Sequence, residues 1–258
     1  MKEKWMELKK YMPLLGELVI RDIKVRYRRS ALGILWTVLT PLLTMMVMTL
    51  LFSKLFINDI QNFAVYYFTG YILYSFCNES TMTALRSVID NQNLIKKVYI
   101  PTYLFPLSKI ASALMNLLFS FIALLIVMLF TGAVFHPAIF LSVIVVFFLA
   151  VFCLGLGMIL CTMFVFFRDI GHFYGVVTLL WMYLTPIFYP ASLLESTAPL
   201  LLKCNPLYYY ISAFRSLIMD GKMPSLQICL MGIAAAAAML AAGAYVFEKR
   251  KKEFILYI

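Results

Sequence analysis

The sequence predicts an all-α, polytopic membrane protein with six transmembrane helices, an N-terminal amphipathic interface helix and short outer-leaflet helices before the last span. Three observations predict this class: an excess of apolar residues, six long apolar stretches, and an uneven distribution of Lys and Arg. Apolar residues make up 64% of the 258 residues, against about 45–50% in a soluble domain. A soluble fold would expose this excess to water, whereas a bilayer accommodates it.

Six apolar stretches are long enough to cross a bilayer, because about 20 helical residues span a hydrocarbon core of about 30 Å. The predicted spans are residues 33–53, 64–85, 104–131, 138–167, 172–190 and 227–247. Each is expected to be helical, since a helix satisfies its own backbone in lipid and the alternating pattern of membrane strands is absent. Pro186 and Pro190 leave the end of the fifth span open.

The positions of Lys and Arg predict the orientation of these spans. One set of flanking segments holds eighteen of them and the other set holds four, which are Lys54, Lys203, Arg215 and Lys222. The side with more positive charge is expected to face the cytoplasm, together with both termini. We therefore expect one membrane domain over 1–258, with a cytoplasmic interface helix (1–32), a six-span region (33–247) and a cytoplasmic tail (248–258).

No catalytic constellation is recognisable in the sequence. The five cysteines form no CxxC pair or Cys/His cluster, so neither disulfides nor a metal site are expected. His136 and His172 are isolated, and no phosphate-binding P-loop motif is present. We expect no cofactor and no ATPase site on this chain. Orientation and anionic lipid account for the net charge of +10, so no nucleic-acid partner is expected.

From Pro13 onward the N-terminal region has the periodicity of a helix, with Pro13 in its first turn. Apolar residues recur every three or four positions on one face, and charged residues occupy another; the apolar set is Leu8, Met12, Leu15, Val19 and Ile23. Glu17–Arg21 and Asp22–Arg26 have the spacing of i,i+4 ion pairs. A basic amphipathic helix before a first span is expected to lie in the membrane interface. A solvated basic tail is the alternative.

The predicted cytoplasmic loop 87–103 is too apolar for a simple linker. Apolar residues interleave with two lysines in the run Leu94, Ile95, Lys96, Lys97, Val98 and Tyr99. Asp90 or Asn91 is expected to cap a short helix that Pro101 ends. Its exposed apolar groups indicate docking, either on the chain itself or on a partner.

The predicted outer segment 190–226 combines four prolines with apolar runs. We expect short helices that dip into the outer leaflet. Amphipathic helices lying flat on the outer face remain an alternative.

Aromatic and charged residues inside the spans are candidates for a substrate pathway. Tyr67, Tyr71 and Tyr74 share one helix face, and Trp181 and Tyr183 lie in the fifth span. Aromatic faces let a sugar chain slide, although aromatic residues also belong at bilayer interfaces and in helix packing.

Glu79 is the one ionisable residue clearly within a predicted span, which marks it as a functional candidate. It is expected to pair with Arg86, to lie in a dimer interface, to line the pathway, or to be a satisfied structural carboxylate. At the second predicted cytoplasmic turn, Arg168 and Asp169 are expected to pair locally and cap a helix, with partner contact as the alternative.

Six motifs occur in one order along nearly the whole chain. They begin at Arg21-Asp22, Asn93-Leu94, Phe167-Arg168-Asp169, Thr185-Pro186, Asn205-Pro206 and Phe247-Glu248. In this order they resemble the membrane subunits of type-2 ABC exporters, in the branch that exports O-antigen, capsule and teichoic-acid polymers.

The resemblance implies a homodimer in the bacterial cytoplasmic membrane, joined to two ABC ATPase subunits. A lipid-linked glycan or polyol-phosphate polymer would pass between the subunits. The residues expected to couple to the ATPase are Arg21, Arg26, Leu94, Ile95, Lys96, Lys97, Val98 and Tyr99. An ABC exporter of a drug or another lipid is the first alternative, and an ion-coupled transporter that uses Glu79 is the second. A membrane enzyme is disfavoured because no site is apparent.

Overall fold

The computed structural model describes residues 2–27, 32–33, 35–56, 59–98 and 100–257, and every regular element among them is helical. This confirms the predicted all-α class. The helices are α1 (Lys2–Tyr27), α2 (Leu35–Phe52), α3 (Phe63–Asp90), α4 (Gln92–Lys97), α5 (Leu104–Thr131), the 3-10 helix η1 (Pro137–Leu141), α6 (Ser142–Phe166), α7 (Ile170–Tyr183), α8 (Ala191–Thr197), α9 (Pro199–Cys204), α10 (Pro206–Ile218), α11 (Leu226–Arg250) and α12 (Phe254–Tyr257).

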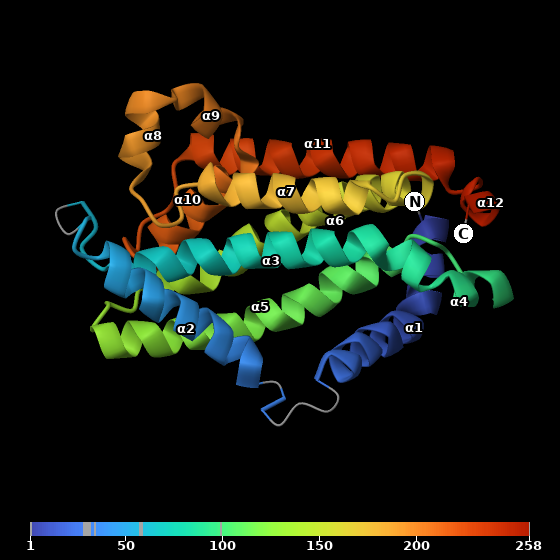
Figure 1. Ribbon diagram of the computed structural model, residues 1–258, viewed down its shortest axis with the longest axis horizontal. Coiled ribbons are helices and arrows are strands. Elements are labelled where there is room, and N and C mark those ends of the chain that lie inside the picture. The colour runs from blue at the N-terminus through green and yellow to red at the C-terminus, as the bar shows by residue number, and fades with distance from the viewer. Residues whose placement is uncertain (1, 28–31, 34, 57–58, 99, 258) are drawn as a thin grey trace.

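The long helices run side by side, and the short ones gather at the two ends (Figure 1). Both termini, α4 and α12 lie at one end, which we call the terminal end; α8, α9 and α10 lie at the other, which we call the α10 end. Helix α3 is central, because it packs against α2, α5, α6, α7 and α10. Helix α1 lies beside α5 at the terminal end.

Four of the described helical segments are long and apolar enough to cross a membrane: α2, α5, the continuous segment from η1 through α6, and α11. Helix α3 has 28 residues, but its polar side chains lower its hydropathy, and it is instead surrounded by protein. Helix α7 has only 14 residues and ends at Tyr183, before Pro186. The predicted fifth span therefore extends too far, because the chain turns where proline removes a helical donor. A count of six spans stays a prediction.

Close packing of α6 on α11 depends on two glycines. A Cβ on Gly155 would lie 2.3 Å from the carbonyl oxygen of Met239, and one on Gly243 would lie 2.1 Å from that of Gly155. The backbones of the two helices are thus in direct contact. Small residues allow such contact between helices in lipid, where van der Waals packing drives association.

The N-terminal helix begins earlier than its sequence pattern predicts. Helix α1 starts at Lys2 and contains Pro13 in its interior rather than in its first turn. A proline costs one backbone hydrogen bond in such a position, yet the helix continues on both sides of it.

The segment between α7 and α11 folds into short helices, as predicted. Asn205 organises it: its side chain accepts hydrogen bonds from the Leu207 amide at 3.1 Å and the Trp181 indole at 2.8 Å. It also donates to the Thr185 hydroxyl at 2.8 Å. Asn205 therefore caps α10 and fastens it to the end of α7.

Candidate functional site

Helix α1 is fastened to the spans by polar contacts along one of its faces. The Lys109 ammonium of α5 lies 2.8 Å from the Asp22 carboxylate. Both side chains are mostly buried, at 14% and 15% exposure. Arg21 donates to the Asn91 side chain at 3.0 Å, at the junction of α3 and α4. Arg21 and Asp22 were predicted to form i,i+4 pairs with Glu17 and Arg26. They instead contact residues of neighbouring helices, which present better-placed partners.

The third contact involves the carboxylate inside α3. Arg26 pairs with Glu79, and Asn116 of α5 donates to the same Glu79 oxygen at 2.6 Å. Of the alternatives for Glu79, pairing with Arg86 is not found among the ion pairs of the described residues. Arg86 instead places its guanidinium over the Phe164 ring, 5.9 Å from the centroid, whereas α1 delivers Arg26 directly to Glu79. Three helices thus meet at one carboxylate.

An apolar cluster supports these polar contacts. Leu18 is buried and packs with Ile100, Leu104 and Phe105, and Tyr11 and Leu14 pack against this cluster from α1. A displacement of α1 would therefore be passed to α5 and to the loop before it, since packed side chains transmit rather than absorb strain.

Helix α4 divides its residues between this cluster and the surface. Leu94 and Ile95 pack against the cluster, so docking on the chain itself is observed for these two. Lys96 and Lys97 are exposed, and the exposed fraction of Val98 is 52%. Tyr99 lies outside the described residues. Asn91 precedes α4 without a side-chain capping bond, because its side-chain oxygen instead accepts from Arg21; its amide donates to the Ser87 carbonyl at 2.7 Å.

A cavity of about 300 Å³ lies between α2, α3 and α5, and Arg26, Glu79 and Asn116 form part of its wall. Tyr71 and Ser75 of α3 line it as well, opposite Trp36 and Thr40 of α2. Hydroxyl, amide and ionic groups therefore line a cavity beside a helix that is apolar enough to span a membrane.

The five aromatic candidates do not converge on one surface. Tyr67 and Tyr74 are buried, and Tyr74 donates to the Thr178 carbonyl of α7 at 2.8 Å. Tyr71 stacks on Tyr67 with ring centroids 5.4 Å apart and alone of these tyrosines lines the 300 Å³ cavity. Trp181 is engaged by Asn205, while Tyr183 is exposed at the end of α7.

Arg168 and Asp169 are both exposed in the turn between α6 and α7. Asp169 makes no side-chain capping bond to α7, so the predicted capping is wrong. The Arg168 guanidinium lies 5.5 Å from the Phe164 ring centroid. Both charges are placed where a partner can reach them.

Three site residues were not predicted: Asp22 as a partner of Lys109, Lys109 itself, and Asn116. Asn116 had a visible signal, because it is a lone amide within the apolar run 104–131. Asp22 and Lys109 had none, since no local pattern indicates that α1 lies along α5.

The fold and these contacts define a multi-span helical membrane protein whose N-terminal helix is fastened to its spans by ionic contacts. Residues 13–219 match the family described as ABC-2 type transporter, and this chain belongs to that family. It is 32% identical over 252 residues to the O-antigen export system permease protein RfbA of Myxococcus xanthus, covering 96% of each chain.

Two further relatives extend this comparison. The O-antigen export system permease protein RfbA of Klebsiella pneumoniae is 29% identical, with 93% of each chain covered. The capsule polysaccharide export inner-membrane protein CtrC of Neisseria meningitidis serogroup A is 27% identical, with 68% of each chain covered. The chain is thus an integral membrane permease of the ABC-2 type.

Proposed function

We propose that this chain is the permease subunit of an ATP-driven exporter that moves a lipid-linked polysaccharide or polyol-phosphate polymer across the bacterial cytoplasmic membrane. The observation that carries the proposal is the similarity to O-antigen export permeases along almost the whole chain. The capsule export relative supports the same class of cargo. The transporter is a homodimer with two ABC ATPase subunits, which hydrolyse the ATP.

The exposed end of α4 and the Val98 residue that follows it receive the ATPase. Lys96, Lys97 and Val98 face outward, and the lysines would pair with carboxylates of the partner. Behind them, Leu94 and Ile95 pack against the cluster that holds α1. A movement of an ATPase bound to α4 is therefore transmitted, because α4 is packed against the rest of the chain.

From α4 the displacement passes to the spans through the polar contacts of α1. Arg21 is hydrogen-bonded to Asn91 at the start of α4. Asp22 is paired with Lys109 of α5. Arg26 is paired with Glu79 of α3. These contacts join the ATPase-facing end to helices on two sides of the 300 Å³ cavity. Opening and closing of that cavity is the expected response to the ATPase cycle, with Tyr71 as a sliding surface for the polymer.

The contacts of Glu79 disfavour the ion-coupled alternative. Glu79 accepts hydrogen bonds from both Arg26 and Asn116. These contacts give the carboxylate a structural role, because through them it joins α1 and α5 to α3.

Replacement of Val98 tests the docking surface. Val98→Asp places a charge on the exposed contact and should remove stimulation of the ATPase while membrane insertion is retained. Val134→Asp is the matched control, since Val134 is a valine with an exposed fraction of 66% in the loop between α5 and η1, and η1 packs against α10 rather than α4. In a strain lacking the native gene, normal surface polymer from the Val98→Asp protein would contradict docking on α4.

A further inference from the structure

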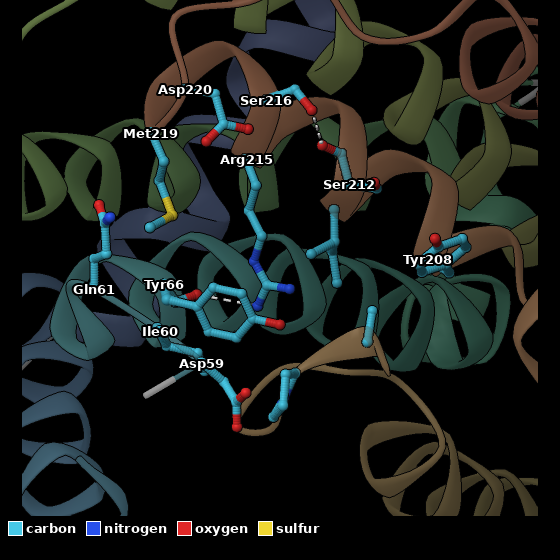
Figure 2. Close-up of a pocket in the computed structure, with 13 residues that line it drawn as sticks. Asp59, Ile60, Gln61, Tyr66, Tyr208, Ser212, Arg215, Ser216, Met219 and Asp220 are labelled. Atoms are coloured by element: carbon cyan, nitrogen blue, oxygen red, sulfur yellow. Dashed lines mark hydrogen bonds between the residues drawn. The ribbon is translucent and has the colours of Figure 1, made fainter. Parts of the chain in front are cut away.

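A second cavity lies at the α10 end, on the opposite side of the molecule from α4. Its volume is about 500 Å³, within the range of about 300–1,000 Å³ that small-molecule sites occupy. Its walls come from residues 59–61, the start of α3, the turn at 190–191, and α10 with the residues that follow it. We call it the α10 cavity (Figure 2).

Arg215 gives this cavity a rigid wall. Its guanidinium donates to the carbonyls of Pro186 at 2.8 Å, Tyr66 at 3.0 Å and Ile187 at 3.1 Å. It also lies over the Tyr66 ring, 3.5 Å from the centroid. Gly70 makes room for it, because a Cβ there would lie 2.8 Å from the Arg215 Nη2 atom. Arg215 therefore joins α10, α3 and the turn after α7.

The donors of Arg215 are largely used on these carbonyls, so the residue positions the cavity walls rather than serving as an open receptor for anions. Its Nε atom is buried and has no hydrogen-bond partner among the described residues. The guanidinium lies beside the Tyr66 ring (Figure 2).

The groups left to meet a ligand are carboxylates, an amide, hydroxyls and an aromatic ring. Asp59 and Asp220 are exposed side chains on the wall, and neither has an ion-pair partner among the described residues. Gln61, Ser212, Ser216 and Tyr208 are further polar residues of the lining. Two free carboxylates repel a phosphate or an anionic lipid headgroup. They accept strong hydrogen bonds from neutral hydroxyl groups.

We infer that the α10 cavity binds neutral sugar residues of the exported polymer at the end opposite the ATPase surface. Carboxylates and Gln61 would accept and donate hydrogen bonds at the sugar hydroxyls, while an apolar sugar face would rest on the Tyr208 ring. The inference depends on the proposed function, because it takes the polymer to be a glycan. To that function the inference adds a binding subsite for the polymer as it leaves the transporter.

The test measures binding to the purified full-length chain in mild detergent by calorimetry. The probe is the repeating-unit oligosaccharide released by mild acid from the surface polysaccharide of the source bacterium. We expect Asp59→Ala with Asp220→Ala to weaken its binding at least about tenfold, since charge-assisted hydrogen bonds are lost. Both positions are exposed, so folding should be spared. Glu195→Ala is the control: an exposed carboxylate on α8 that does not line the cavity.

A second variant fills the cavity without changing its charge. Ser216→Phe should also weaken oligosaccharide binding, because Ser216 lines the cavity and is partly exposed. Inorganic phosphate should neither bind nor compete. The inference is overturned if the native chain does not bind the oligosaccharide, if these variants bind it as the native chain does, or if phosphate displaces it.

This result is separable from the proposed function. A chain that exports surface glycan and co-purifies with an ATPase, yet does not bind the oligosaccharide, removes only the α10 subsite. A deletion strain with unchanged surface glycan removes the proposed function itself.

Discussion

Arg26, near the end of α1, pairs with Glu79 inside α3, 53 residues further along the chain. A carboxylate within the helix bundle is thereby neutralised by a helix that precedes the first predicted span. Asn116 of α5 completes the arrangement. The relationship makes α1 part of the packed helix bundle rather than an appended tail, and the first prediction depends on it.

The first prediction concerns the energy of this pair. Arg26→Gln and Glu79→Gln should each lower the unfolding midpoint in detergent by roughly 2–4 °C, corresponding to about 1 kcal/mol for a partly exposed pair. The double variant should lose less than the sum, because the two side chains are in contact. Scanning fluorimetry of the four proteins measures this.

Arg86 and Glu79 provide a control double-mutant cycle. Its contact is with the Phe164 ring rather than with Glu79, so Arg86→Gln and Glu79→Gln should be additive. Coupling between residues 79 and 86 of the same size as that between 26 and 79 would contradict the arrangement.

The second prediction concerns the lysines of α4. Reversal of both charges, with Lys96→Glu and Lys97→Glu, should release the ATPase during purification, because like charges would then face each other at the interface. Lys203→Glu with Lys222→Glu is the control, since both lysines are exposed, the first in the last turn of α9 and the second between α10 and α11. Retention of the ATPase by the α4 variant would exclude the lysines as contacts.

The third prediction concerns the contact between α6 and α11. Gly243→Ala should destabilise the protein by roughly 1–3 kcal/mol or more, because the added methyl group meets the Gly155 backbone and has no room to move. Gly175→Ala should be neutral or stabilising, since its nearest neighbour is the Met82 Cε atom at 4.0 Å and alanine favours a helix over glycine. Equal midpoints for the two variants would show that the helices do not touch.

The fourth prediction concerns topology. Both termini should be cytoplasmic, and the loop at 132–136 and helix α8 should face the opposite side, because the Lys and Arg residues are concentrated on the terminal side. Single cysteines at Val134 and Glu195 should react with a membrane-impermeant maleimide in intact spheroplasts, and one at Lys252 should not. Labelling of residue 252 would reverse the orientation.

The sequence predicted those helices whose signal is local. Helices α2, α5 and α11 lie close to their predicted bounds, because long apolar runs carry the information directly. Helix α7 ends before its apolar run does, since Pro186 and Asn205 redirect the chain. The partner of Glu79 was not predictable from spacing, because Arg86 was the nearest cation along the helix, while Arg26 reaches Glu79 only through tertiary packing. Arg215 was counted only among the cations outside the spans, because its contacts with Tyr66, Pro186 and Ile187 also arise from tertiary packing.

The most direct test of the central claim is an affinity purification of this chain from its native membrane in mild detergent, with identification of every protein that co-purifies. The account predicts a P-loop ATPase in equal amounts, and its loss with the Lys96→Glu and Lys97→Glu variant. Recovery of the chain alone, from membranes shown to preserve other ABC complexes, would contradict the claim that an ATPase drives it.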